Sequence, residues 1–207
     1  MEKAVARRAG QCVPRQYASR KAGTPLVWCD GPGADALDMA ATALRYDEPM
    51  PPPQRLAQTL EVPHGLHPEA YVAEFMREFG ASVKETVLWN SVRGQVLSIN
   101  RGIFERHGGG TKIDKRGRHQ YVRYVAHGLK VPDEVWYVRE SSGVEKLYYL
   151  ARMQVGGGAP IETLAVFRWS GNAWEPTTGY QGGDAKYVAG RREWLQTAGT
   201  LLYQRGE

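Results

Sequence analysis

Four segments rich in β-branched and aromatic residues, all after Pro132, constrain the fold more than any other feature. They are EVWYVRE, VEKLYYLARMQV, IETLAVFRWS and NAWEPTTGY, and the short turns SSG, VGGGAP and SGN join them. Runs of this composition between glycine-containing turns are typical of β-strands. Turns this short leave no room for a crossover helix, so neighbouring strands should run antiparallel. The sequence therefore predicts a sheet of about four antiparallel strands.

Helices are expected before this sheet. The segment that begins at Pro68 has apolar residues at helical spacing and should end at Gly80. Three further predictions concern shorter segments: a helix over 34–45, a helix that begins at Ser98, and a helix RHQYVRYVAHGL that closes at Gly128. Residues 84–97 should form one or two short strands, and the segment 187–205 suits either a helix or a closing strand. The fold class is thus α+β, with helices packed on an antiparallel sheet.

The chain also divides by composition. Residues 1–33 suggest no regular structure, and the proline-rich segment 46–68 should be a linker or a strap over the core. We therefore predict a basic arm with a short helix and a proline-rich strap over 1–67. The α+β domain should occupy 68–207.

Several classes of function lack their motifs. Two cysteines are too few for a disulfide framework or a structural zinc site, and His64 and His67 lie among prolines and glycine, which argues against a shared metal. No nucleotide-binding loop, membrane-length apolar run or secretory signal is found. We expect no metal, no cofactor, no membrane partner and a cytoplasmic location, in the bacterium that produces the protein or in a target cell reached with a virion or secretion system.

Positive charge is concentrated in two blocks, and the first, residues 1–29, holds six cations and one acid. The net charge is +5, and residues 101–125 hold seven cations and two acids. Within this second block, four cations fall between Lys112 and Arg118, and His119 and Tyr121 follow at once. Cations beside a side chain that titrates near neutrality suit phosphodiester chemistry. The alternative is a solvated loop that leads into an amphipathic helix.

RNA carries its own nucleophile, the 2′-hydroxyl, so an enzyme must supply a base, an acid and cations for the charged transition state. Residues of the right types are present. His119 could act as the base, and the remaining roles could fall to Tyr180 or Tyr149, to Thr177 or Thr178, and to Arg118, Arg152 or Lys112.

The order of several short pieces resembles the C-terminal region of phage Mu F-like minor head proteins. These pieces span about 66–204 and include LHPEAYVAEFMREFGA, GQVLSINRGIF, TKIDKRGRHQYV, PDEVW, LYYLARM, VFRW, TTGY and LLY. That region ends in a nuclease module of the barnase/EndoU/colicin/RelE-like superfamily. The resemblance implies helices on a four-stranded antiparallel sheet, and RNA cleavage by transesterification without a metal.

Motif position in this family points to Lys112, Arg118, Glu134, Trp136, Arg152, Thr178 and Tyr180. Our predicted catalytic residues are His119, added on chemical grounds, with Arg152, Thr178 and Tyr180. The predicted substrate-binding residues are Lys112, Arg118, Tyr121, Glu134, Tyr149 and Arg192.

The leading hypothesis is a toxin-like, phage-derived ribonuclease, with RNA and possibly tRNA as substrate and an acidic immunity or antitoxin protein as partner. One alternative is a phage head or packaging protein that keeps the fold but only binds. A third hypothesis, transfer of ADP-ribose from NAD, rests on composition alone.

Overall fold

The computed structural model describes residues 14–17, 26–29, 49–106, 110–113, 115–181 and 185–206. The chain divides into two compact units, Met1–Ala41 and Thr42–Glu207. In the first unit, β1 (Pro14–Tyr17) and β2 (Leu26–Cys29) form a two-stranded antiparallel sheet. The prediction that residues 1–33 lack regular structure is therefore wrong for these two strands. The helix predicted over 34–45 lies outside the described residues.

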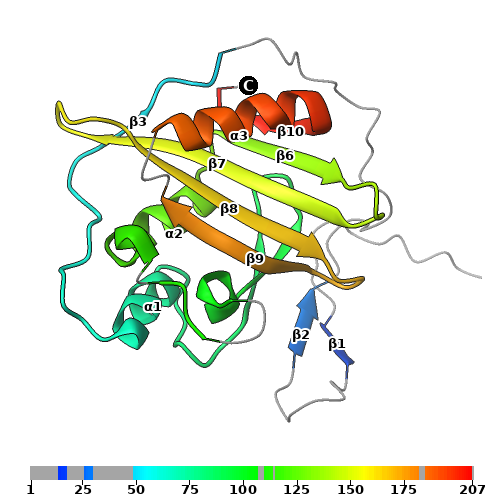
Figure 1. Ribbon diagram of the computed structural model, residues 1–207. Helices are drawn as coiled ribbons and strands as arrows, with labels where there is room; N and C mark the ends of the chain where they lie inside the picture. Colours follow the sequence, from blue (N-terminus) through cyan, green and yellow to red (C-terminus); the bar gives the residue numbers. More distant parts are fainter. Residues whose placement is uncertain are drawn as a thin grey trace, which may run out of the picture. The chain divides into compact units, whose positions relative to one another are not determined.

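The second unit is built on a curled sheet of eight strands (Figure 1). Seven of them follow the order β10-β6-β7-β8-β9-β5-β4, and β3 pairs with β7 in parallel. The strands are β3 (Gln54–Leu56), β4 (Val87–Asn90), β5 (Val96–Ile99), β6 (Glu134–Arg139), β7 (Glu145–Val155), β8 (Ile161–Trp169), β9 (Trp174–Gln181) and β10 (Thr200–Gln204). Strands β6 to β9 form the antiparallel meander that the sequence predicted, but the sheet has more strands than the expected four.

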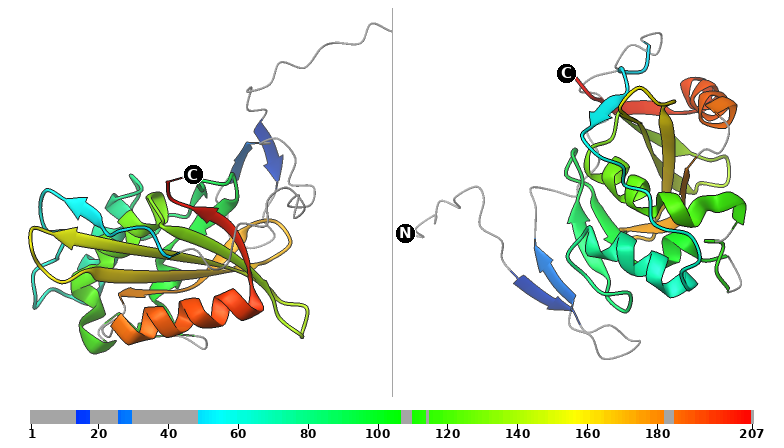
Figure 2. Two further views of the ribbon diagram at one scale, coloured as in Figure 1. Left: turned by 90° about the horizontal axis from the view of Figure 1, so that it is seen from above. Right: turned by 90° about the vertical axis from the view of Figure 1, so that its left-hand side faces the viewer.

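Helices cover both faces of this sheet (Figures 1 and 2). On one face, α1 (Pro68–Arg77) and α2 (Val122–Lys130) share an apolar core with Tyr149 and Phe167 of the sheet. On the other face, α3 (Ala185–Ala198) packs through Val188 and Leu195. Two 3₁₀ helices, η1 (Arg101–Phe104) and η2 (Lys115–Tyr121), precede α2. The α+β class is confirmed.

Helix α1 forms where the sequence predicted it. Pro68 occupies the first turn, and the His67 side chain accepts a hydrogen bond from the Glu69 backbone. Phe75 and Met76 face the core, and Gly80 adopts a positive φ of 71° just past the helix. A left-handed residue is the usual way to end a helix, because it lets the last carbonyls find donors.

Two local predictions are wrong, and the tail resolves an open choice. Ser98 lies inside β5, and Asn100 caps the short η1 instead, accepting from the Gly102 backbone at 2.8 Å. Gly128 does not end its helix, since α2 continues to Lys130. The segment 187–205 contains both of the expected elements, most of α3 followed by β10.

Gly128 has a packing role in place of the predicted capping role. A Cβ atom there would lie 2.5 Å from Thr163 Oγ1 and 3.0 Å from Ala151 Cβ. The absence of a side chain therefore lets α2 approach strands β7 and β8 closely.

We expect Gly128→Ala to lower the free energy of unfolding by about 1–3 kcal/mol, because the clash outweighs the gain in helix propensity. Gly190→Ala in α3 is the matched control: a Cβ at Gly190 meets nothing within 4 Å, so it should raise stability by up to about 1 kcal/mol. Urea unfolding of both variants measures this, and a Gly128→Ala protein as stable as the wild type would contradict the packing role.

Candidate active site

The register of the central strands brings several predicted site residues to one face of the sheet. Arg152 lies opposite Glu162 across β7 and β8, and Leu164 lies opposite Tyr180 across β8 and β9. Because side chains alternate between the two faces, Arg152, Glu162, Thr178 and Tyr180 all lie on the face that α3 covers. Arg152 and Glu162 share one register position near the end of the face, and Tyr180 and Thr178 follow one and two same-face positions further along. We call these four residues the polar row.

The Arg152 side chain is hydrogen-bonded to a segment that precedes the sheet strands β4 to β10. Its Nη2 donates to the carbonyls of Met50 (2.9 Å) and Pro51, and its Nε is buried without a hydrogen-bond partner. Met50 and Pro51 belong to the strap, which we define as residues 49–62. The Gln204 and Arg205 side chains donate to other strap carbonyls, at Pro49 and Pro52. The Nη2 group of Arg152 is therefore used by the chain itself, whereas its buried Nε–H is not.

Glu162, the neighbour of Arg152 on β8, also has an unused atom. Its Oε2 is buried and has no hydrogen-bond partner, and no ion pair joins it to Arg152 among the described residues. Burial raises the pKa of the Glu162 carboxyl above its ordinary value of 4.5, and the charge of Arg152 only partly opposes this. A carboxylate with a raised pKa beside an arginine is a candidate general base.

The basic segment contacts strand β9. The Arg118 guanidinium lies 4.6 Å from the centre of the Tyr180 ring, a cation–π contact. Lys112 Nζ donates to the Thr177 carbonyl at 2.8 Å. Burial, and then the charge of Arg118, lower the pKa of the Lys112 amine. The structure thus brings Lys112, Arg118, Thr178 and Tyr180 together at β9.

Two predicted substrate-binding residues bind each other. Glu134 is fully buried, and Arg192 of α3 donates to both of its carboxylate oxygens at 2.8–3.0 Å. Trp136 Nε1 donates to the same carboxylate at 2.8 Å. Glu134 is closed to a substrate, so the expectation for it needs correction. Its network instead ties α3 to the sheet.

His119 does not join the polar row. Its ring packs against Tyr71 of α1, with centroids 4.8 Å apart, and against His64 at 5.6 Å. Tyr71 belongs to the core on the opposite face of the sheet from Arg152. The expected convergence of His119, Arg152 and Thr178 is therefore not observed.

Tyr149 is likewise on the opposite face. It is 2% exposed and packs edge-to-face on Phe167. Burial raises the pKa of its hydroxyl well above the ordinary value. It is a core residue in this structure, because an odd-numbered position on β7 points away from Arg152. Tyr121, by contrast, lines a pocket that is described below.

Sequence reasoning missed Glu162. The pairing of Arg152 with Glu162 across neighbouring strands is visible in the sequence, but as an ordinary ion pair. Only the structure shows that both side chains keep a buried atom without a partner.

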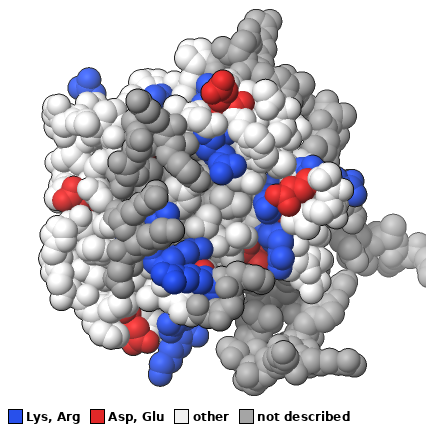
Figure 3. Space-filling view, viewed as in Figure 1, with Lys and Arg blue, Asp and Glu red and all other residues white. Residues whose placement is uncertain are grey.

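The face drawn in Figure 1 is rich in positive charge. Lys and Arg side chains gather in the middle of this face, with few acidic side chains among them (Figure 3).

No three metal-ligating side chains come together among the described residues. None of the described helices is both long and apolar enough to span a membrane.

A cationic strand face with a raised-pKa carboxyl is an arrangement suited to binding and cleaving a phosphodiester. Comparison with known proteins shows that the chain belongs to a class of nucleases. Residues 74–204 match the family described as phage-Barnase-EndoU-ColicinE5/D-RelE like nuclease2, and the chain belongs to this family. No curated protein and no solved structure matches the chain. The association with Mu F-like head proteins stays a prediction.

The buried Glu134–Arg192 pair gives a test of its structural role. We expect Glu134→Gln to lower the free energy of unfolding by about 3 kcal/mol or more, because it removes the charge of a fully buried carboxylate that accepts from both Arg192 and Trp136. Glu105→Gln is the matched control, since the Glu105–Arg101 pair is exposed (42% and 45%, against 0% and 17% for Glu134 and Arg192). It should cost less than about 1 kcal/mol. Equal losses in thermal or urea unfolding would contradict this role.

Proposed function

We propose that this nuclease is a metal-independent endoribonuclease, in which the 2′-hydroxyl of RNA attacks the neighbouring phosphate. The observation that carries the proposal is the pair of buried, unpartnered atoms at Arg152 and Glu162, next to Tyr180 and Arg118 on one strand face. A phosphate oxygen would supply the acceptor that Arg152 Nε lacks, and a hydroxyl would supply the donor that Glu162 Oε2 lacks.

In the proposed reaction, the Glu162 carboxylate removes the proton from the 2′-hydroxyl as its oxygen bonds to phosphorus. Arg152 and Arg118 stabilise the added negative charge on the phosphate oxygens. The bond from phosphorus to the 5′-oxygen then breaks, and the Tyr180 hydroxyl donates a proton to that leaving oxygen. Thr178 positions the phosphate. The products are a 2′,3′-cyclic phosphate end and a 5′-hydroxyl end, with no oxidant or metal required for the balance.

This assignment replaces His119 with Glu162 as the base. The sequence suggested His119 because histidine is a common general base, but its ring contacts Tyr71 and His64 on the other side of the sheet. A base must reach the proton that it removes, so position takes priority over pKa.

The proposal predicts that the purified chain cleaves RNA in the presence of EDTA and leaves 2′,3′-cyclic phosphate ends. Glu162→Gln should slow cleavage by about 10²–10⁴-fold, as expected for loss of a general base. Arg118→Ala should slow it by about 10²-fold through lost stabilisation of the phosphate charge.

Two variants serve as controls for this assay. Arg168→Ala removes an exposed cation from the same strand as Glu162, and His119→Ala tests the earlier assignment. Both should retain near wild-type rates per folded molecule. An inert but folded wild type would contradict the ribonuclease proposal and favour a protein that only binds. Cleavage that depends on His119 and not on Glu162 would contradict the choice of base.

The raised pKa of Glu162 also predicts how activity and stability depend on pH. A base acts only when deprotonated, so the cleavage rate should fall as pH drops through a pKa above 4.5. Burial penalises the ionised form only in the folded protein, so the penalty on folding is absent below 4.5, grows as pH rises from 4.5 to the folded pKa, and is complete above the folded pKa.

Glu162→Gln should therefore raise the melting temperature at pH 7 and leave it unchanged at pH 4 or below, while cleavage is lost. Melting curves of the two proteins across this range test the assignment independently of activity. A variant less stable than the wild type at pH 7 would show that Glu162 has a structural partner.

A further inference from the structure

Four consecutive carbonyls at the start of the strap accept hydrogen bonds from side chains of β7, β10 and the residue after β10. The carbonyls are those of Pro49, Met50, Pro51 and Pro52, and their donors are, in the same order, Gln204, Arg152 for the middle two, and Arg205. We call residues 49–52 the lid. Neither the family match nor the proposed reaction assigns a role to it.

The lid resembles a nucleic acid backbone in one chemical respect, because nearly all of its backbone polar groups are acceptors. Proline has no N–H, and three of the four lid residues are prolines, so only Met50 carries a backbone donor. Phosphate oxygens likewise accept hydrogen bonds from the cationic side chains of proteins. The lid can therefore occupy donors that a phosphate would otherwise bind.

The lid covers the edge of Arg152 that suits a phosphate best. In a guanidinium, Nε–H and Nη2 lie on one edge, and such an edge can bind two oxygens of the same phosphate. Both contacts with the lid are made by Nη2, to the carbonyls of Met50 (2.9 Å) and Pro51, whereas the buried Nε–H has no partner. With the lid in place, a phosphate can use only one of the two groups on this edge.

Apolar contacts add to these hydrogen bonds. Pro51 is buried, and the Met50 side chain packs against the apolar cluster beneath α3, which contains Trp136, Tyr148 and Tyr180. The lid is thus held by a few apolar contacts and by hydrogen bonds to neutral carbonyls. A charged phosphate oxygen makes a stronger hydrogen bond with arginine than a neutral carbonyl does, so a phosphate can displace the lid.

The strap is fixed again directly after the lid. Strand β3 begins at Gln54 and pairs with β7. The Gln54 side chain donates to the Val131 carbonyl at 2.8 Å and to the Asp133 carboxylate at 3.0 Å. The lid can therefore move about its junction with β3 while the rest of the strap stays bound to the sheet.

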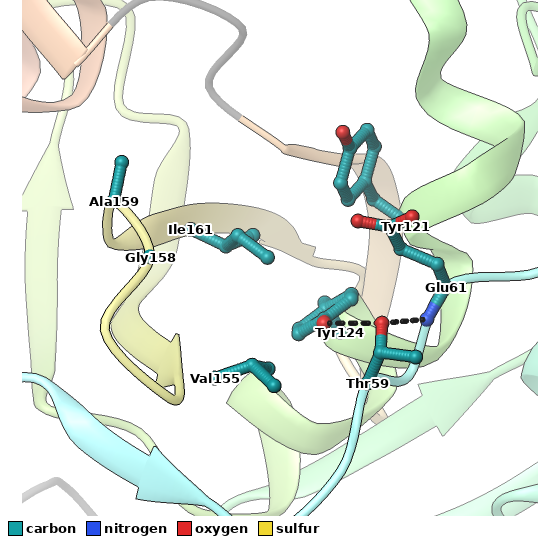
Figure 4. Close-up of a pocket in the computed structure, with 8 residues that line it drawn as sticks. All are labelled: Thr59, Glu61, Tyr121, Tyr124, Val155, Gly158, Ala159 and Ile161. Atoms are coloured by element: carbon teal, nitrogen blue, oxygen red, sulfur yellow. Dashed lines mark hydrogen bonds between the residues drawn. The ribbon is translucent and has the colours of Figure 1, made fainter.

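The far end of the strap has its own attachment, beside a pocket of about 360 Å³ that Tyr121 also lines (Figure 4). The hydroxyl of the fully buried Tyr124 is bonded to Thr59 Oγ1 and accepts from the Leu60 backbone, each at 3.1 Å. These bonds do not involve Arg152, so opening of the lid leaves them intact.

We propose that the lid is an autoinhibitory element that competes with the RNA phosphate for Arg152, an inference that rests on the proposed ribonuclease function. The apparent affinity for RNA is then lower than that of the open protein, in proportion to the fraction of molecules whose lid is open. Because the lid precedes residues 74–204, this control lies outside the part of the chain that matches the nuclease family.

Met50→Ala tests the lid by removing the side chain that packs it against the cluster beneath α3. Isothermal titration of the full chain with 2′-O-methyl UpA, which cannot be cleaved, should show binding about tenfold tighter than in the wild type, because more molecules are open. The cleavage rate at RNA concentrations well below saturation should rise by a similar factor.

Two controls show whether the effect passes through Arg152. Leu66→Ala shortens an apolar side chain that is 41% exposed and lies outside the strap, so it should change neither binding nor cleavage. In an Arg152→Ala background, Met50→Ala should leave the affinity for 2′-O-methyl UpA unchanged, because no guanidinium remains to be uncovered. An equal gain in that background would overturn the competition for Arg152.

Methyl NMR of the wild-type chain follows the lid without a substitution that could affect folding. The cluster that Met50 packs against contains three aromatic residues, so its methyl signal should be displaced from that of a solvent-exposed methionine. Saturation with 2′-O-methyl UpA should move the signal toward the exposed value. A Met50 signal that does not move at saturation would overturn the proposal.

The two proposals can fail separately. Tighter binding of 2′-O-methyl UpA by Met50→Ala, in a chain that cleaves no RNA, would overturn the cleavage proposal and keep the lid as a competitor for phosphate. RNA cleavage by the wild type, with no gain in affinity or rate in a folded Met50→Ala protein, would overturn autoinhibition alone.

Discussion

The antiparallel register of strands β6 to β9 is the constraint on which the rest of the structure depends. It places Arg152 opposite Glu162 and Leu164 opposite Tyr180, so that the residues of the polar row share the face that α3 covers. The same alternation sends Tyr149 to the core beneath α1 and α2. A shift of a strand by one residue would exchange its two faces and bury the polar row in that core.

Charges on this face serve two different ends. The buried carboxylate of Glu134 accepts hydrogen bonds from Arg192 and Trp136. These bonds attach α3 to the sheet. Arg152 and Glu162 are each left with a buried atom that has no partner. Unsatisfied buried groups cost folding free energy, and in the proposed reaction a phosphate oxygen and a ribose hydroxyl would satisfy these two.

The strap contributes to the proposed site although it precedes the residues matched by the nuclease family. Its carbonyls at Met50 and Pro51 accept from Arg152 and cover the edge of the guanidinium that a phosphate would use. Farther along, Thr59 and Glu61 form one side of the pocket at Tyr121. A short segment with little regular structure can have this influence because it is anchored by side chains of the sheet, such as Gln204, and by backbone pairing with β7.

The sequence by itself determined the elements whose signals are local. The period-two strands β6 to β9 and the amphipathic α1 follow from patterns within about a dozen residues. The short turn between β7 and β8 also limits their possible registers, and the observed one places Arg152 opposite Glu162. Only the tertiary structure decided which face each helix covers, that β3, β4, β5 and β10 extend the sheet, and that His119 turns toward Tyr71. These outcomes depend on contacts between residues far apart in the chain, for which a single sequence carries no periodic signal. The same reason explains why both carboxylate oxygens of Glu134 have hydrogen-bond partners whereas Oε2 of Glu162 has none. The partners of a carboxylate come from the elements that fold against it, and these can be far away in sequence.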